Sequence, residues 1–184
     1  MTYSTPSPTD DRLVPSRRGR FERRSVLVLA LFLAISFAVA AFGSLTTIAS
    51  KDGWYADASK VAWTSPGWMF GPVWTVLYVL MAVSAWLVWR HRKFEDVRPA
   101  LLLYVVQLFV NSLWSPVFFA GYSLIGAASL WIALAVILVL DVCVIATLVT
   151  FWPISRTAAL LLLPYLAWIL YSTTLNLGDA YLNS

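Results

Sequence analysis

Aromatic rings and carboxamides, repeated at helical spacing, are the side chains in this sequence best suited to recognise a small molecule. Five of them follow one another in the middle of the chain, each three or four residues after the last: Tyr104, Gln107, Asn111, Trp114 and Phe118. This spacing places all five on one face of a helix. A carboxamide that faces lipid lacks hydrogen-bond partners, so we expect this face to point into a helix bundle.

Two other segments carry a similar face. One offers Tyr165, Trp168, Ser172 and Asn176, and the other offers Phe70, Trp74, Tyr78 and Met81. Flat aromatic walls with a few amide donors and acceptors suit a large, planar, mostly apolar ligand. Ordinary packing between helices, with the amides bonded across the interface, is the alternative for each face taken alone. Three matching faces in one small protein favour a shared cavity.

Acid–base and metal chemistry have few candidates in this chain. The single histidine, His91, and the single cysteine, Cys143, exclude a two-histidine site and a cysteine cluster, so we predict no metal site. Asp141 is the one acid between two long uncharged stretches. It is a candidate functional group; the alternative is a structural acid that is protonated or paired with Ser or Thr hydroxyls at a dimer interface. No nucleophile–base pair is visible, so we predict no catalytic residue of the hydrolase type.

The composition places the three faces in a membrane. Of the 184 residues, 60% are hydrophobic and 12% are charged, and the mean hydropathy is +0.77. A soluble domain averages roughly 25% charged residues, so this composition argues against a soluble enzyme. The net charge of +4 would fit nucleic acid. The charges lie in short clusters between apolar stretches, however, as in membrane proteins, so we expect no nucleic-acid partner.

Long uncharged stretches define the elements that position these residues. A helix needs about 20 apolar residues to cross the roughly 30 Å hydrocarbon layer. The stretch 99–140 is too long for one helix, and Ala120–Ser123, with a glycine and polar residues, predicts a turn within it. Four helices with one re-entrant segment is the alternative to five. We predict an all-α integral membrane bundle of five transmembrane helices, with spans near 25–48, 66–89, 99–119, 126–151 and 157–178.

The charged segments predict the ends and the orientation. Residues 1–24, rich in Pro, Ser, Thr and Arg, are typical of a disordered basic tail, and residues 25–184 form one transmembrane domain. Eleven Lys and Arg residues lie in the tail and in the second-to-third and fourth-to-fifth connections, against two in the first-to-second connection. This excess predicts a cytoplasmic N-terminus and a C-terminus outside.

Several motifs along the chain occur in the order of a known family. They are Trp54-Tyr55, Phe70-Gly71-Pro72-Val73-Trp74-Thr75, Tyr104-x-x-Gln107-Leu108-x-x-Asn111-x-x-Trp114, and Pro164-Tyr165-Leu166-x-Trp168 with Leu175-Asn176. From about Leu29 to Asn183, the chain resembles the tryptophan-rich sensory protein family (TspO/MBR), also called the translocator protein or peripheral benzodiazepine receptor family.

The resemblance implies a five-helix bundle in a bacterial cell membrane, often a homodimer, that binds porphyrins and related hydrophobic ligands. The family's pocket positions correspond to Tyr55, Trp74, Asn111, Trp114 and Trp168. Together with the three faces, the expected ligand-binding residues are Tyr55, Trp74, Tyr78, Tyr104, Gln107, Asn111, Trp114, Trp168 and Asn176. Lys60 is a candidate contact for ligand carboxylates, with a solvated side chain as the alternative. No covalent cofactor is expected; the expected ligand is a porphyrin or heme-like tetrapyrrole.

Three functions are consistent with this interpretation. The first is a membrane receptor or transporter that regulates tetrapyrrole metabolism or a stress response. The second is a weak photo-oxidative enzyme that uses Trp74 and Trp168, since the resemblance includes relatives linked to light-dependent porphyrin breakdown. The third is an interaction subunit that regulates a membrane partner through its basic tail and loops. We favour the first, a role without enzymatic activity.

Overall fold

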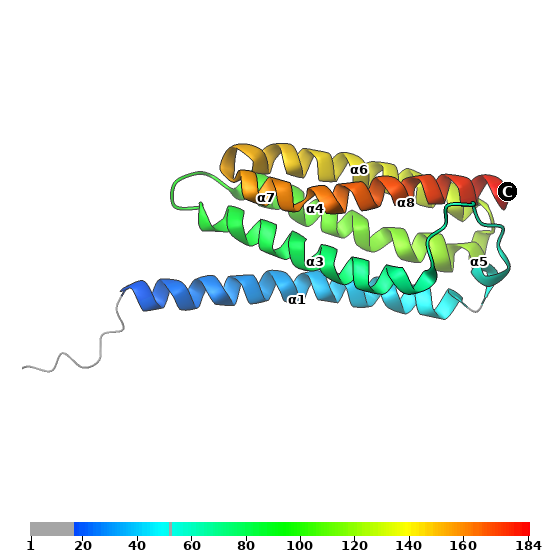
Figure 1. Cartoon of the computed structure of the whole chain (residues 1–184), viewed down its shortest axis with the longest axis horizontal. Helices are drawn as coiled ribbons and strands as arrows, with labels where there is room; N and C mark the ends of the chain where they lie inside the picture. Colours follow the sequence, from blue (N-terminus) through cyan, green and yellow to red (C-terminus); the bar gives the residue numbers. More distant parts are fainter. Residues whose placement is uncertain (1–16, 52) are drawn as a thin grey trace, which may run out of the picture.

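The computed structural model of the protein describes residues 17–51 and 53–184. Over these residues the regular elements are all helical: α1 (Arg17–Lys51), α2 (Trp54–Asp57), α3 (Gly67–Arg90), α4 (Arg98–Ser115), the π-helical turn η1 (Pro116–Ala120), α5 (Gly121–Ile125), α6 (Ala128–Ile154), α7 (Arg156–Leu161) and α8 (Leu163–Leu182). Five segments are long and apolar enough to cross a membrane: Glu22–Ile48, Gly67–Arg90, Arg98–Ile125, Ala128–Phe151 and Arg156–Leu182. They run side by side along the molecule (Figure 1). The predicted all-α fold with five spans is confirmed.

The first helix begins earlier than the sequence predicted. α1 starts at Arg17, so the disorder predicted for residues 17–24 is wrong. No proline interrupts the chain between Pro15 and Pro66, and arginine and glutamate are good helix formers. The membrane-spanning helix therefore continues beyond its apolar part. Residues 1–16, the rest of the predicted tail, lie outside the described residues.

The turn predicted at Ala120–Ser123 is also wrong, because the chain stays helical there. Pro116 lacks an N–H group, and the wider turn η1 begins at this residue, with the Gly121 N–H donating to the Pro116 carbonyl. An unpaired backbone group is costly in a bilayer, so a wider helical turn is favoured over a break. The chain turns instead at Gly126, whose φ of +62° is a conformation that suits glycine.

The last span is interrupted near a proline. α7 ends at Leu161 and α8 begins at Leu163, because Pro164 cannot donate a hydrogen bond to the carbonyl one turn before it. Between the two helices, the Leu162 N–H bonds the Ala159 carbonyl at 3.0 Å. The interruption places Tyr165 in the first turn of α8, where its side chain is fully buried.

Charged residues gather at one end of the bundle. The start of α1, the α3–α4 connection and the α6–α7 turn lie together there (Figure 1). We call this end the basic end (residues 22–24, 90–98 and 155–156). The short helices α2 and α5 and the C-terminus lie at the opposite end, the loop end (Figure 1). The connections that the charge count assigned to one side of the membrane thus share one end of the molecule.

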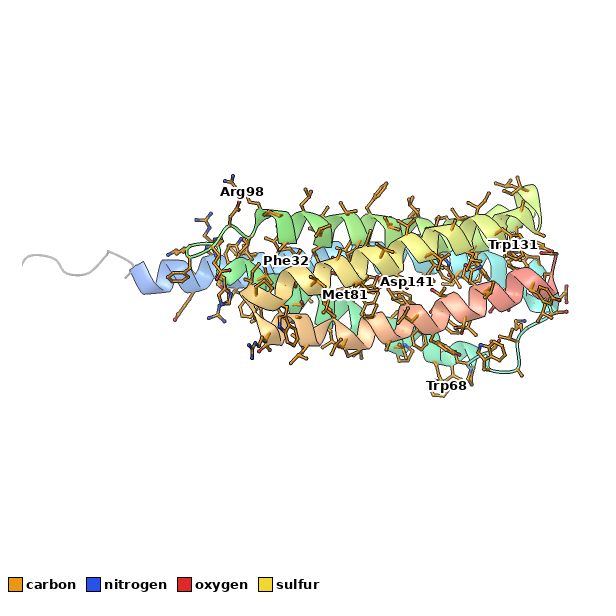
Figure 2. The ribbon with its side chains drawn as sticks, turned by 90° about the horizontal axis from the view of Figure 1, so that it is seen from above. Phe32, Trp68, Met81, Arg98, Trp131 and Asp141 are labelled. Atoms are coloured by element: carbon orange, nitrogen blue, oxygen red, sulfur yellow. The ribbon has the colours of Figure 1, made fainter. Side chains whose placement is uncertain are left out.

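Side-chain positions separate the interior from the lipid-facing surface. Met81 and Asp141 lie among the helices, whereas Trp68 lies at the margin (Figure 2). Met81 is fully buried, while Trp68 is 74% exposed. Large apolar side chains on the surface are expected for a helix that faces lipid rather than water.

Candidate functional site

Three long helices meet through a hydrogen-bonded group near the middle of the bundle. The Tyr78 hydroxyl of α3 donates to Asn111 Oδ1 of α4 at 2.7 Å. Asn111 Nδ2 then donates to the Tyr165 hydroxyl of α8 at 3.0 Å. The Trp74 ring stacks on Tyr78, with 5.3 Å between ring centroids. We call Trp74, Tyr78, Asn111 and Tyr165 the inner aromatic group; it shows that the three predicted faces point toward one another.

A second group lies nearer the loop end. Trp114 Nε1 donates to Asn176 Oδ1 at 3.0 Å, and Asn176 Nδ2 donates to the Leu130 carbonyl at 2.9 Å. The Tyr55 ring packs edge-on against Phe118 and Phe119. We call Tyr55, Trp114, Phe118, Phe119 and Asn176 the outer aromatic group. It links the short helix α2 to the third and fifth spans.

Two predicted site residues carry buried polar atoms without a hydrogen-bond partner among the described residues. Gln107 is fully buried, and neither its Oε1 nor its Nε2 is bonded. The Trp168 ring packs against Phe70 and Tyr171, and its buried Nε1 also lacks a partner. A buried unpaired polar atom costs about 1–3 kcal/mol. These atoms are therefore the positions where a polar group of a ligand would gain most.

Tyr104 occupies a different environment from the other predicted site residues. Its hydroxyl lies 3.3 Å from Ser36 Oγ on α1. Its ring stacks on Phe151 of α6 and packs edge-on against Phe32 of α1. The helical spacing placed Tyr104 correctly in the interior, where it is 1% exposed. Its polar contact is with the first span rather than with the inner aromatic group.

The loop between α2 and α3 is fastened to α8 at the loop end. Ser59 and Asn183 exchange two hydrogen bonds of 2.9 Å through the Ser59 backbone and the Asn183 carboxamide. The Tyr171 hydroxyl donates to the Trp63 carbonyl at 2.8 Å and accepts from the Ser65 N–H at 3.1 Å. We call residues 58–66 the strap. Sequence reasoning missed both anchors, Tyr171 on α8 and Asn183 directly after it.

Charged and phenolic groups surround the start of the strap. Lys60 Nζ lies 4.7 Å from the centre of the Tyr55 ring, so the cation is close to a predicted ligand-binding residue. Burial, and then the nearby Asp179 carboxylate, raises the pKa of Tyr55 to about 12. The Tyr55 hydroxyl is therefore neutral at physiological pH and can donate a hydrogen bond.

Asp141 is bonded within the bundle, between α6 and α8. Its Oδ2 lies 2.9 Å from Thr173 Oγ1, and its side chain is 7% exposed. A hydroxyl partner agrees with the sequence-based alternative, but it comes from Thr173 of the same chain rather than from a dimer interface. Among the described residues, no group of three or more His, Cys, Asp or Glu side chains could hold a metal ion.

These features define a helical membrane protein of five spans whose interior carries aromatic and carboxamide groups from three helices. The model of the TspO/MBR family matches residues 32–182, and the chain belongs to this family. It is 40% identical over 152 residues to the tryptophan-rich protein TspO of Archaeoglobus fulgidus, covering 83% of this chain and 92% of that protein.

Two further relatives extend the comparison. The tryptophan-rich sensory protein of Cereibacter sphaeroides is 36% identical over 154 residues, covering 84% of this chain and 92% of that protein. The human translocator protein is 40% identical over 125 residues, covering 67% of this chain and 70% of that protein. The family indicated by the sequence motifs is therefore confirmed.

Proposed function

We propose that the protein binds a porphyrin or another planar hydrophobic tetrapyrrole between α3, α4 and α8, as a membrane receptor or transporter. The observation that carries the proposal is the convergence of aromatic and carboxamide side chains from three helices in the inner aromatic group. Aromatic faces recognise a flat conjugated ring system by stacking. The names of relatives, sensory protein and translocator protein, agree with a role in recognition or passage rather than hydrolysis.

Each part of the site has a distinct task in this proposal. Trp74 and Trp168 flank the ligand with their rings, and Trp168 Nε1 and the Gln107 carboxamide supply polar contacts that the protein leaves unused. Lys60 lies at the loop end, beside Tyr55, where a cation would pair with a ligand carboxylate. Ligand binding then satisfies buried polar atoms as well as burying a large apolar surface.

Tryptophan fluorescence provides the test. Porphyrin added to the purified protein in detergent quenches the emission, and Trp74→Ala/Trp168→Ala weakens the affinity. Stacking on two rings at about 0.5–1.5 kcal/mol each beyond buried area corresponds to a loss of roughly five- to 150-fold. Trp68→Phe is the matched control, because Trp68 lies on the same helix as Trp74 and is 74% exposed. An unchanged affinity in the double variant would refute the proposal.

A light-dependent breakdown of the bound porphyrin is the second candidate. The observation that favours it is the presence of two oxidisable indoles, Trp74 and Trp168, in the proposed site. The pigment absorbs the light, and the indoles need only exchange electrons with it. Illuminated protein should then yield a product that pigment in detergent alone does not, and Trp74→Phe/Trp168→Phe should reduce its rate.

Orientation and assembly complete the proposal. The basic end faces the cytoplasm of a bacterial cell, because loops rich in Lys and Arg stay on that side, and the C-terminus lies outside. Labelling of single cysteines placed at Glu95 and Ser184 in a Cys143→Ser background, with a reagent that does not cross the membrane, should modify only the latter. The protein forms a homodimer, as expected for the family, and light scattering in detergent should give a mass of two chains.

A further inference from the structure

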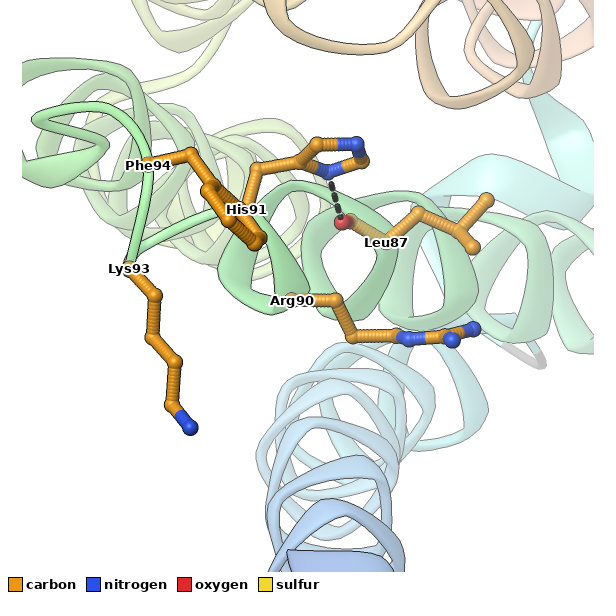
Figure 3. A pocket seen from close by; sticks show the side chains of 5 residues that line it. All are labelled: Leu87, Arg90, His91, Lys93 and Phe94. Carbon is orange, nitrogen blue, oxygen red and sulfur yellow. Dashed lines mark hydrogen bonds between the residues drawn. The ribbon is translucent and has the colours of Figure 1, made fainter.

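A hollow opens at the basic end, where α3 leaves the membrane-spanning region. Its volume is about 510 Å³, and it is lined by Leu87, Arg90, His91, Lys93 and Phe94 (Figure 3). The second span ends at Arg90 and the third begins at Arg98. The hollow therefore lies at the depth of the lipid headgroups, far from the aromatic groups of the proposed tetrapyrrole site.

The lining side chains are positioned by a hydrogen-bonded turn. The His91 carbonyl accepts from the N–H groups of Phe94 and Glu95 at 2.8 and 3.2 Å. His91 Nδ1 lies 2.9 Å from the Leu87 carbonyl, and since a carbonyl only accepts, Nδ1 carries the hydrogen. This bond fixes the imidazole on one side of the hollow, and the Arg90 and Lys93 side chains lie on the other side, where they extend in different directions (Figure 3).

Arg90 is also oriented from the side of α1. Its guanidinium lies 4.9 Å from the centre of the Trp86 ring. The Trp86 indole is fixed in turn, because its Nε1 donates to the Ser25 carbonyl at 2.9 Å. An arginine that stacks on an aromatic face keeps its N–H groups directed outward, where they can bind an oxyanion with two hydrogen bonds.

Positive charge exceeds negative charge around the hollow. Residues 22–24 and 90–98 contain six Arg and Lys side chains and three acidic ones. One of the acids, Asp96, accepts a bond from the Arg98 backbone N–H at 3.1 Å. Burial and the positive charge of nearby Arg24 lower the pKa of the Arg92 guanidinium. An anion entering the hollow would therefore meet a favourable potential.

We propose that this hollow binds the headgroup of an anionic phospholipid, with the phosphodiester on Arg90 and Lys93 and the glycerol and upper acyl chain on Leu87 and Phe94. The apolar part of the lining decides between a lipid and free phosphate, because Leu87 and Phe94 offer nothing to an inorganic anion. Phe94 is 84% exposed, so its ring is available to an amphipathic molecule. Basic pockets at the cytoplasmic ends of membrane helices recognise anionic headgroups by this combination.

The proposal differs from general attraction between basic loops and an anionic membrane. General attraction depends only on the number of charges at the basic end. A headgroup site depends on which charges are removed, since Arg90 and Lys93 line the hollow and Arg98 does not. Arg23 also lies outside the lining and has an exposed side chain. Pairs of substitutions that remove the same charge at different positions therefore separate the two explanations.

The experiment measures lipid binding to the full chain in a zwitterionic detergent, by native mass spectrometry and by thermal unfolding. The probes are phosphatidylglycerol, phosphatidylcholine with the same acyl chains, and inorganic phosphate. Phosphatidylglycerol should bind and raise the unfolding temperature more than the other two. Arg90→Gln/Lys93→Gln should weaken its binding about thirtyfold, whereas Arg23→Gln/Arg98→Gln should change it less than about threefold.

Two further variants keep the result interpretable. Arg90→Lys/Lys93→Arg retains both charges and should recover most of the affinity, which shows that the glutamine variant fails in binding rather than in folding. Phe94→Ser should weaken phosphatidylglycerol binding and leave any effect of inorganic phosphate unchanged. Equal losses in the two glutamine pairs, equal binding of phosphatidylcholine, or an equal effect of inorganic phosphate would each overturn the proposal.

Discussion

A methyl group added at Gly178 tests whether the strap closes the outer part of the site. A Cβ atom at this position would overlap Val61 Cγ1 and would lie 3.5 and 3.7 Å from the Cβ and Cγ2 atoms of Val61. A valine side chain has few rotamers and cannot move far on its own. In Gly178→Ala the strap must therefore shift away from α8.

The size of the effect follows from the contacts that hold the strap. Overpacking of this kind typically costs about 1–3 kcal/mol. Complete release would break the four bonds that Asn183 and Tyr171 form with the strap, each with a net contribution of about 0.5–1.5 kcal/mol. Complete release of the strap therefore costs about 2–6 kcal/mol. We expect the overlap in Gly178→Ala to weaken strap closure by about 1–3 kcal/mol. The ratio of closed to open protein then falls roughly five- to 150-fold.

Hydrogen–deuterium exchange measures strap closure without any ligand. The Ser59 and Ser65 amides, which donate to Asn183 and Tyr171, should exchange faster in Gly178→Ala by roughly the same five- to 150-fold. If the strap retains ligand, porphyrin should dissociate faster by up to the same factor, measured by stopped-flow recovery of tryptophan fluorescence. The matched control is Gly178→Ala/Val61→Ala, which removes the overlapping carbon and leaves a contact of 3.5 Å.

The double variant should restore slow exchange of both amides, because the remaining contact is an ordinary one. Unchanged exchange in Gly178→Ala, or a double variant as fast as the single one, would refute the reasoning about strap closure. If exchange behaves as expected and porphyrin dissociation does not change, the strap closes but does not retain the ligand. Amide exchange therefore tests closure of the strap, and porphyrin dissociation separately tests whether the strap retains the ligand.

Two other substitutions test the interior. Asn111→Ala leaves the hydroxyls of Tyr78 and Tyr165 without their shared partner and should lower stability by about 2–4 kcal/mol, measured by thermal unfolding in detergent. Asp141→Asn keeps an oxygen that accepts from Thr173 and carries no charge into the bilayer, so stability should stay within about 1 kcal/mol of the parent or rise. A tenfold loss of porphyrin affinity in Asp141→Asn would instead give this residue a functional role.

The inner aromatic group shows what helical spacing can predict. A period of 3.6 residues determines which side chains share a face, and the cost of a carboxamide in lipid determines which face turns inward. Together these two rules predicted that Tyr78, Asn111 and Trp168 point inward; Tyr78 and Asn111 are buried, and Trp168 is half-buried. These rules predict the rotation of each helix about its own axis only approximately. Tyr104, on the expected face, consequently bonds Ser36 rather than the aromatic residues of α3 and α8.

The strap anchors and the turn at Gly126 are two features that the sequence did not predict. Ser59 and Asn183 are 124 residues apart in the chain, and neither has a local pattern that identifies its partner. The glycine and polar residues at 120–123 had the composition of a turn, yet the chain stays helical there and forms a π-helical turn that begins at Pro116. In a membrane, the cost of unpaired backbone groups outweighs the weak turn preference of a single glycine.

The bonds within the site also indicate where a ligand can bind at least cost. Asn111 and Asn176 already use their carboxamides on other parts of the protein, so a ligand that captured them would leave hydroxyl, indole or carbonyl groups unpaired. Gln107 and Trp168 have buried polar atoms without partners among the described residues. A ligand that bonds these atoms therefore breaks no hydrogen bond of the protein. Asn111 and Asn176 are therefore better suited to hold the helices together, and in the proposed function the polar contacts to the ligand are assigned to Gln107 and Trp168.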